Sequence, residues 1–543
     1  MRILITGARI VDGTGGPSTS GDLLIDGDRI GDPRHGALRP DEVLEARGLV
    51  VAPGFIDMHS HDDFMLPMVP TAEAKLLQGV TTEVVGNCGL GIQPANAAVD
   101  AMYSRFLPLI FGERGGDSSP DLAAYRARLE EGGVSVNVAC LIPHGNVRCA
   151  AMGMAERAPT ASELRQMVEL VEQGMAQGAF GLSTGLVYPP GRFADTAELV
   201  TLAAAVRPGG GLYASHVRDE ASGVEGAVAE AIRIGEEAGV AVQISHHKAV
   251  GFTNWGKVKR TLQLVDEARG RGVDVSSDMY PYTAGSTILA ALVLSPWAFE
   301  GTTEETVGRL RDPAARQRLA DECDARFVEM VKLPGALRRL PGRVKPLLRE
   351  LVARSLIVSS VRKNRQYEGL SLRQVMRLRH QGFYEAVYDL LLEEEGAVAV
   401  IAHAMHERDV RRVFAHPETM VGTDGFPLRE GKPHPRTYGT FPRVFAEYVR
   451  KEKLLTLEAA VHRMTGLTAR KLGFRDRGVI RVGAVADLVL FDPLRIEDRA
   501  TYDQPRRTPI GIPHVFVGGA WTVRDGLHTG ARRGRVLRRD AGG

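Results

Sequence analysis

Cysteine is scarce in this chain of 543 residues, which contains only four. So few cysteines over such a length exclude a disulfide framework, and a reducing cytoplasm is the expected location. Long apolar runs are missing as well. None approaches the roughly 20 residues of a membrane helix, and the apolar start within residues 1–7 is interrupted too early for a signal peptide. We therefore expect no membrane partner.

The chain also lacks an excess of charge of either sign. It has 68 Lys and Arg against 66 Asp and Glu, a formal net charge of +2. Binding to nucleic acid normally requires clustered basic side chains, so a nucleic-acid partner is not expected. Hydrophobic residues make up 44% and charged residues 25%, as in ordinary globular enzymes. The length predicts more than one domain.

An apolar run near the N-terminus leads into two histidines separated by one residue, His59 and His61. Alternate side chains of an extended strand share a face, so these imidazoles can converge on one point. Imidazole nitrogens are good zinc ligands, and the nearby Asp57, Asp62 and Asp63 can ligate or orient them. The alternative is a pair of surface histidines in a loop. We favour a metal site because matching candidates follow downstream.

The two ends of the chain share a pattern of short apolar strands and tight turns. Candidate strands lie at residues 3–5, 23–27, 49–51, 478–480, 487–491 and 515–519. Asp26-Gly27 is a hairpin signal. We predict one small β-sandwich built from both termini, that is from residues 1–53 and 478–543.

The middle of the chain alternates short apolar strands with helical stretches, which is typical of βα units. The candidate strands are residues 55–57, 82–85, 135–141, 180–183, 212–215, 241–245, 274–277 and 420–423. Eight strands close a (β/α)₈ barrel. A doubly wound open sheet is the alternative, but no GxGxxG-type turn follows a first strand. We predict an α/β fold with a TIM-like barrel, its strands one to seven within 54–289 and the rest, including strand eight, within 366–477.

A long interval separates the seventh and eighth predicted strands. Residues 290–365 are predicted to form an inserted helical subdomain, and a further apolar strand at 397–402 precedes the eighth. Long excursions beside an active site often act as lids. A passive packing insert is the alternative.

Functional groups of such barrels lie at the C-terminal ends of the strands. Candidates at these ends are His59 and His61 after strand one, Cys88 after two, His216 after five, His246 after six and Asp424 after eight. Four histidines, one thiolate candidate and one carboxylate are enough for one or two Zn²⁺ ions. His246 and His247 point opposite ways in a strand, so at most one of them ligates easily.

These stretches resemble the amidohydrolase superfamily and, within it, the N-acyl-D-amino-acid deacylases (D-aminoacylases). The resemblance covers nearly the whole chain and is carried by residues 54–63, 86–89, 183–190, 244–248, 278–287, 422–425, 438–443 and 486–493. The two histidines alone mark only the superfamily. Asn87-Cys88-Gly89 and His246-His247-Lys248 are much more specific.

In many superfamily members a carboxylated lysine after strand four bridges two metals, but that strand offers no lysine here. In the deacylases a cysteine on strand two takes its place, and Cys88 matches it. The resemblance implies that Cys88, His216 and His246 hold one tight Zn²⁺, while His59 and His61 complete a second, weaker site with Cys88. A thiolate and two imidazoles suit a high-affinity zinc site with an open fourth position. The alternative for Cys88 is a buried apolar cysteine.

The resemblance also assigns the catalytic carboxylate, Asp424. It would take the proton of a zinc-bound water as the water attacks the amide, and then protonate the leaving amine. The alternative is a carboxylate that only hydrogen-bonds a ligand or caps the following turn. A histidine at the end of strand three, His144, is similar to one in the family and receives no ligand role.

Four further residues would bind the substrate by resemblance. Lys248, Tyr280 and Ser286 would grip its α-carboxylate, and Tyr188 would place the scissile amide. Lysine is a plausible point-charge partner for a carboxylate, and simple packing is the alternative for both tyrosines. Residues 287–294 contain no cation, which favours substrates with neutral or apolar side chains.

The resemblance thus implies a zinc hydrolase that splits a small-molecule N-acyl-D-amino acid into a carboxylate and a free D-amino acid. The preference for the D-enantiomer comes from the resemblance alone. Other amidohydrolase activities, on a cyclic amide, a dipeptide or another N-acyl compound, are alternatives. So is a catalytically inactive scaffold, against which the complete ligand set and Asp424 argue.

Overall fold

The structure is a computed structural model that describes residues 1–33, 39–106, 118–299, 303–331, 341–426, 428 and 430–539. Parallel strands at the centre of the chain form two hydrogen-bonded groups. The first contains β6 (Phe55–Asp57), β7 (Val80–Val85) and β8 (Asn137–Cys140). The second contains, in spatial order, β9 (Ile142–Pro143), β10 (Gly181–Gly185), β11 (Leu212–His216), β12 (Ala241–Ile244), β13 (Val275–Met279) and β17 (Thr419–Val421).

Backbone hydrogen bonds span both gaps between these groups. The chain runs from β8 almost directly into β9, and Phe180 N, just before β10, donates to Cys140 O at 2.9 Å. At the other edge Met58 N donates to Val421 O at 3.2 Å. The predicted barrel is thereby confirmed, with β8 and β9 acting as one strand.

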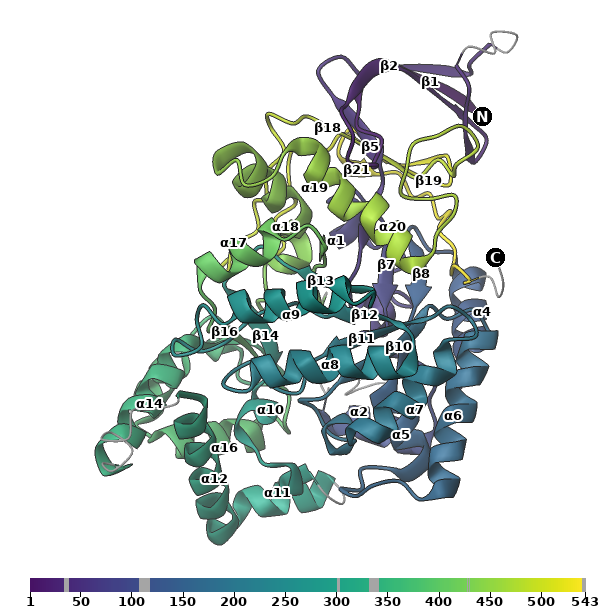
Figure 1. Cartoon of the computed structure of the whole chain (residues 1–543). Coiled ribbons are helices and arrows are strands. Elements are labelled where there is room, and N and C mark those ends of the chain that lie inside the picture. The colour runs from purple at the N-terminus through teal and green to yellow at the C-terminus, as the bar shows by residue number, and fades with distance from the viewer. Residues whose placement is uncertain are drawn as a thin grey trace.

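Helices cover the outside of the barrel. These helices are α1 (Glu73–Leu76), α2 (Ala97–Phe106), α4 (Leu122–Gly132), α5 (His144–Met152), α6 (Ala161–Ala176), α7 (Thr196–Val206), α8 (Val224–Ala238), α9 (Val258–Gly270), α17 (Glu407–Ala415), α18 (Arg436–Arg443), α19 (Leu457–Met464) and α20 (Gly466–Leu472). Helices α8 and α9 lie side by side across the front of the barrel (Figure 1). Buried residues of α8 recur at helical spacing, as in Val224, Val228 and Ala231. Gly239, with a φ of 68°, ends this helix in the left-handed conformation that glycine adopts without strain.

Both termini contribute to one β-domain above the barrel (Figure 1). Its strands are β1 (Arg2–Ile10), β2 (Thr19–Asp26), β3 (Arg29–Gly31), β4 (Glu42–Glu45), β5 (Val50–Pro53), β18 (Leu488–Phe491), β19 (His514–Val517), β20 (Ala520–Arg524) and β21 (Leu527–His528). Where the sequence suggested the layers of a sandwich, hydrogen bonds run without a break from β21 to β3, because β5 pairs with both β1 and β18. Side chains from both ends, including Ile3, Ile25, Leu488 and Phe516, share one core.

The segment that follows this domain returns to the barrel. Val138 N, in β8, donates to Arg535 O at 2.9 Å, and Leu537 N donates to Val138 O at 2.8 Å. Leu537 packs against the inner core of the barrel, which includes Phe180 and Leu212. Residues 534–539 therefore help to close the end of the barrel at which the strands begin.

The excursion between β13 and β17 contains β-structure as well as helices. Its elements are β14 (Ala284–Ile288), α10 (Leu289–Val293), α11 (Thr303–Arg311), α12 (Pro313–Val331), α14 (Pro341–Ser355), β15 (Leu356–Val361), α15 (Leu372–Arg379), α16 (Phe383–Glu393) and β16 (Val398–His403). The strands form an antiparallel sheet in the order β14-β16-β15. The predicted strand at 397–402 is the central strand of this sheet. The predicted helical interval 290–365 lies inside the excursion, and its residues 300–302 and 332–340 are outside the described residues.

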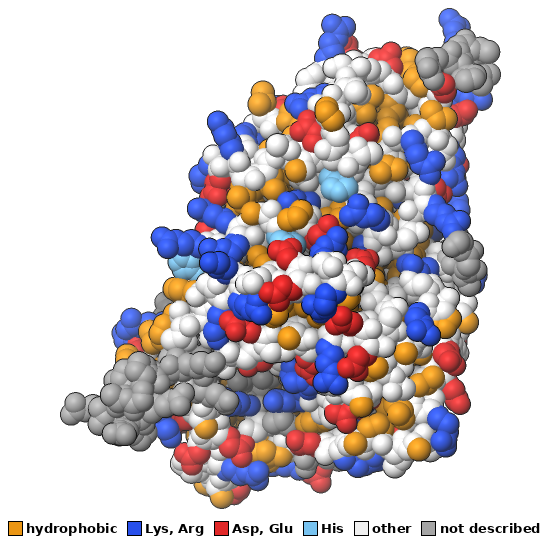
Figure 2. Space-filling model, viewed as in Figure 1, with side chains coloured by type: hydrophobic (Ala, Val, Ile, Leu, Met, Phe, Trp, Pro, Cys, Tyr) orange, Lys and Arg blue, Asp and Glu red, His pale blue; other side chains and the backbone are white. Residues whose placement is uncertain are grey.

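The described helices include none that is both long enough and apolar enough to cross a bilayer. Acidic and basic side chains are interspersed on the face shown in Figure 2, over α8 and α9. That face presents no large field of a single sign.

Candidate metal and substrate site

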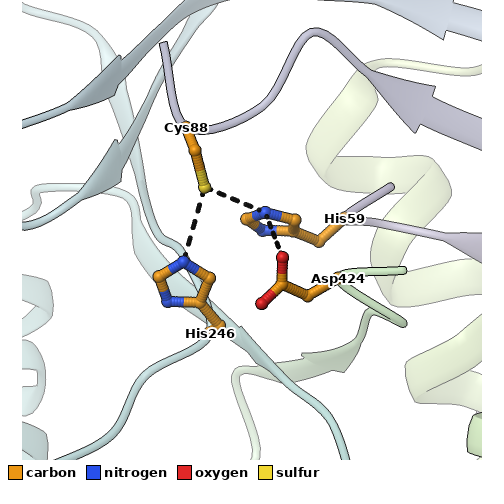
Figure 3. Close-up of side chains that lie close together, drawn as sticks. All are labelled: His59, Cys88, His246 and Asp424. Carbon is orange, nitrogen blue, oxygen red and sulfur yellow. Dashed lines mark hydrogen bonds and ion pairs between the residues drawn. The ribbon is translucent and has the colours of Figure 1, made fainter. Parts of the chain in front are cut away.

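Four side chains meet where β6, β7, β12 and β17 end: His59, Cys88, His246 and Asp424 (Figure 3). Cys88 Sγ lies 3.2 Å from His59 Nε2 and 3.4 Å from His246 Nε2. Asp424 Oδ1 lies 3.6 Å from His59 Nε2. All four are buried, and one ligand atom from each lies within 4.8 Å of the others. We call this group the rim cluster.

The other two predicted ligands, His216 and His61, touch the rim cluster. His216 Nδ1 lies 3.0 Å from His246 Nε2, and His61 Nε2 lies 3.2 Å from Asp424 Oδ1. Side chains that the sequence separates by more than 300 residues therefore gather at the C-terminal ends of the barrel strands. This is the end at which barrels of this kind carry functional groups.

Three members of the rim cluster have positive backbone φ angles. The values are 54° at Cys88, 35° at His246 and 47° at Asp424. A non-glycine residue in this region costs on the order of 1–3 kcal/mol, and such strain gathers at functional sites. The preceding Gly422 has no room for a side chain, because a Cβ there would lie 2.6 Å from His59 Cβ. The backbone is thus shaped to turn these groups toward one point.

The cluster favours the ionised form of its cysteine. Burial on its own raises the pKa of the Cys88 thiol, but the charges of His59 and His246 outweigh it and hold that pKa well below its ordinary value. The thiolate is the form that binds metal. A thiolate, imidazoles and one carboxylate form a donor set that suits Zn²⁺ better than Mg²⁺ or Ca²⁺.

Two carboxylates that the sequence analysis did not assign support the imidazoles. Asp278 Oδ1, at the end of β13, accepts from His246 N at 2.8 Å and lies 3.2 Å from His59 Nδ1. Glu220 Oε1 lies 3.1 Å from His246 Nδ1. Asp278 directly follows the predicted strand at 274–277, so the rule that found Cys88 could have found it too. Glu220 lies in a loop, where no strand register gives its direction.

A buried arginine, Arg436, also reaches the site without having been anticipated. Its Nη1 lies 2.8 Å from Asp424 Oδ2. Its guanidinium carbon lies 4.5 Å from the centre of the Tyr280 ring, and Lys248 Nζ lies 6.0 Å from the same ring. The Tyr280 hydroxyl is buried and has no hydrogen-bond partner among the described residues. Two cations and an unpaired hydroxyl therefore lie together beside Asp424, an arrangement suited to a carboxylate ligand.

The remaining predicted substrate residues lie at the border between the barrel and the inserted sheet. Ser286 is a half-buried residue of β14, next to Gly285, where an added Cβ would lie 3.5 Å from the Tyr280 hydroxyl. Tyr188 follows β10, and its hydroxyl lies 3.4 Å from Thr287 Oγ1. The Tyr188 ring meets that of His216 edge-on, with centroids 5.2 Å apart.

Two other histidines pair with residues outside the rim cluster. His247 Nε2 pairs with Thr261 Oγ1 at 2.6 Å, on the side of α9. His144 Nε2 lies 2.9 Å from Glu198 Oε1. The opposite orientations of His246 and His247 agree with the alternation expected of neighbouring residues.

Comparison with known proteins shows that nearly the whole chain is similar to one enzyme family. The model of the Amidohydro_3 family, described as "Amidohydrolase family", matches residues 42–523. A D-aminoacylase from Alcaligenes xylosoxydans xylosoxydans is 37% identical, with 99% of this chain and 98% of that protein covered. An N-acyl-D-glutamate deacylase from the same organism is 38% identical, with coverage of 99% and 97%.

Two solved structures are also similar to this chain over nearly its whole length. The crystal structure of N-acyl-D-glutamate deacylase from Bordetella bronchiseptica, in complex with zinc and a phosphonate inhibitor, is 37% identical. The structural alignment covers 99% of this chain and 99% of that chain, with a TM-score of 0.81. A D-aminoacylase structure concerned with a binuclear metal centre is 34% identical, with 99% coverage of both chains and a TM-score of 0.82.

Proposed function

Because the chain belongs to the amidohydrolase family, we propose that it hydrolyses N-acyl-D-amino acids to a carboxylate and a free D-amino acid. The observation that carries the proposal is the convergence of Cys88, His216 and His246 beside Asp424. It is supported by relatives that cover nearly the whole chain and are named as deacylases of such compounds. One solved relative holds zinc and a phosphonate described as a mimic of the tetrahedral intermediate.

Cys88, His216 and His246 would hold one Zn²⁺ tightly through Sγ, Nδ1 and Nε2, the atoms that face one another. His59 and His61, with Cys88, would form a second and weaker site. A bound zinc ion would lower the pKa of a water molecule toward about 7 and would polarise the amide carbonyl.

Asp424 would move the proton. Burial on its own raises the pKa of this carboxyl, but Arg436 and His246 outweigh it and hold that pKa well below the ordinary value. Asp424 is therefore ionised at neutral pH and free to accept a proton from the attacking water. It would then return the proton to the nitrogen of the leaving amine, which departs as the free D-amino acid.

Lys248, Tyr280 and Ser286 would bind the α-carboxylate of the substrate, and Tyr188 would place the amide. Arg436 joins them as a second buried cation. The unpaired Tyr280 hydroxyl supports this role, because a buried hydroxyl without a partner costs about 1–3 kcal/mol that a ligand oxygen would recover. We also propose a reducing, cytoplasmic setting, supported by four buried cysteines that form no disulfide.

A screen of paired N-acetyl-D- and N-acetyl-L-amino acids tests the proposal. We expect turnover of the D series alone, its loss after treatment with a chelator, and its return with zinc. Neutral, apolar and acidic side chains should be compared, and residues 287–294 favour the first two because they carry no cation. Turnover confined to the L series, or insensitivity to chelator, would refute the proposal.

A further inference from the structure

Glu220 is a carboxylate with 13% of its side chain exposed, and the proposed reaction gives it no role. It lies in the loop after β11, four residues beyond His216. Its Oε1 lies 3.1 Å from His246 Nδ1, 3.6 Å from His216 Nε2 and 2.5 Å from Lys248 Nζ. One oxygen atom thus faces both imidazoles and the lysine.

The other nitrogen of each imidazole faces the proposed zinc site. His216 Nδ1 and His246 Nε2 lie 3.0 Å apart, and the latter lies 3.4 Å from Cys88 Sγ. A neutral imidazole binds metal through the nitrogen that carries no hydrogen. In the metal-binding tautomers the hydrogen is therefore on His216 Nε2 and His246 Nδ1, the two nitrogens that face Glu220. An ionised carboxylate only accepts hydrogen bonds, so it favours these tautomers.

Lys248 competes for one of the same nitrogens. Its Nζ lies 2.7 Å from His246 Nδ1. An ammonium group only donates, so a hydrogen bond to Nδ1 would leave the hydrogen of His246 on Nε2 and block its binding of zinc. The ion pair with Glu220 gives the Lys248 ammonium another acceptor.

Hydrogen bonds within the loop and to its neighbour hold the backbone at Glu220 in place. The backbone oxygen of Glu220 accepts from Val250 N at 2.8 Å. The carboxylate of the preceding Asp219 accepts from Ala221 N at 2.5 Å and from Gly223 N at 2.9 Å. Such support limits the positions that the Glu220 carboxylate can take.

We propose that Glu220 is a positioning residue that sets the metal-binding tautomers of His216 and His246. It also keeps Lys248 from holding His246 Nδ1 as a hydrogen-bond acceptor. The inference rests on the proposed zinc site at Cys88, His216 and His246. It concerns a step that precedes turnover, so zinc affinity is its direct readout.

Zinc titration of the metal-free protein against a chromophoric chelator tests it. Removing a carboxylate that orients a metal-bound histidine typically costs about 10- to 100-fold in metal affinity. We expect Glu220→Gln near the lower end, because its amide oxygen still accepts a hydrogen bond, and Glu220→Leu near the upper end. Glu230→Gln is the matched control, because Glu230 pairs with Arg218 at 2.9 Å. The zinc affinity of this variant should equal that of the wild type.

A second variant separates tautomer control from a merely structural role. Adding Lys248→Met to Glu220→Gln removes the competing donor, so the double variant should bind zinc more tightly than Glu220→Gln alone. Lys248→Met in the otherwise unchanged protein should bind zinc like the wild type. Thermal melts of the metal-free variants establish that each is folded.

The outcomes are distinguishable. Wild-type zinc affinity in folded Glu220→Gln and Glu220→Leu, or no recovery in the double variant, would overturn the role of Glu220. A wild-type protein that binds no stoichiometric zinc would instead overturn the proposed function itself.

Discussion

Lys75 and Asp57 form an ion pair that is wholly shielded from solvent, with Nζ 2.8 Å from Oδ2. Asp57 ends β6, the strand that leads to His59, and its carboxylate also accepts from Thr423 N at 2.8 Å and Thr423 Oγ1 at 2.7 Å. Thr423 directly precedes Asp424. The pair therefore ties the strand that carries His59 to the strand that carries Asp424.

Replacing Lys75 with methionine should destabilise the protein strongly. The substitution would leave Asp57 buried without its cation, beside Glu83, whose carboxylate also contacts Lys75. Breaking a buried pair in this way costs about 3–5 kcal/mol, measurable as a lower urea midpoint. Arg233→Met at the exposed Arg233–Glu237 pair is the control and should change the midpoint little. Equal effects of the two substitutions would contradict the role of Lys75.

Asp424→Asn should abolish most turnover while zinc stays bound. Loss of a general acid–base group lowers the rate by about 10²- to 10⁴-fold, whereas Cys88, His216 and His246 remain to hold the metal. Activity and metal content are measured on the same preparation. Asp266→Asn, on the outer helix α9, serves as the control. A nearly unchanged kcat in Asp424→Asn would refute the assignment.

Cys88 and His61 should differ in their effect on metal content. Cys88 belongs to both proposed sites, so Cys88→Ala should purify without tightly held zinc and without activity. His61 belongs only to the proposed weaker site, and its Nε2 lies 3.2 Å from Asp424 Oδ1, so His61→Asn should keep one zinc per chain after dialysis. Elemental analysis decides between them, and the reverse result would exchange the tight and weak sites.

Lys248→Met should weaken the use of substrates that carry a free carboxylate. A charge-assisted hydrogen bond contributes about 1.5–3 kcal/mol, which corresponds to about 10- to 150-fold in kcat/KM. The same comparison with a substrate whose carboxylate is capped as an amide should show no such difference. An equal loss on both substrates would mean that Lys248 does not bind the carboxylate.

Lys471 should make stability depend on pH on the alkaline side. Burial lowers the pKa of Lys471 from 10.5 to about 8, although Asp274 acts in the opposite direction. Between these values the unfolded chain holds more protons than the folded protein, so stability rises with pH, by up to about 3 kcal/mol over the whole interval. Urea unfolding of the wild type and Lys471→Met at pH 7.5 and pH 9.5 measures the difference. An identical pH dependence of the two proteins would contradict it.

The barrel could be predicted because each of its strands is a short apolar run, and most of these runs lead to a polar group at the same end. The strand at 397–402 is equally rich in apolar residues, because it lies between two neighbouring strands and is mostly buried. Only its antiparallel pairing with β14 and β15 separates it from the barrel, and pairing is a long-range property. The continuity of the terminal sheet through β5 is long-range in the same sense.

Within the site, strand register explains which residues could be found in advance. His59, Cys88, His216, His246 and Asp424 lie at or just beyond strand ends, where position gives direction. Glu220 and Arg436 approach from a loop and from the start of α18, where sequence position gives no direction. The division of roles between the ligands came from family resemblance, because spacing does not distinguish a tight metal site from a weak one.

The return of residues 534–539 to β8 has a consequence for how the chain matures. All eight barrel strands leave the ribosome before this segment exists, yet Val138 depends on it for two of its backbone hydrogen bonds. Until then the floor of the barrel stays open and Phe180 and Leu212 lack Leu537 as a neighbour. The floor of the barrel, at the opposite end from the rim cluster, can therefore be completed only after residues 534–539 have been synthesised.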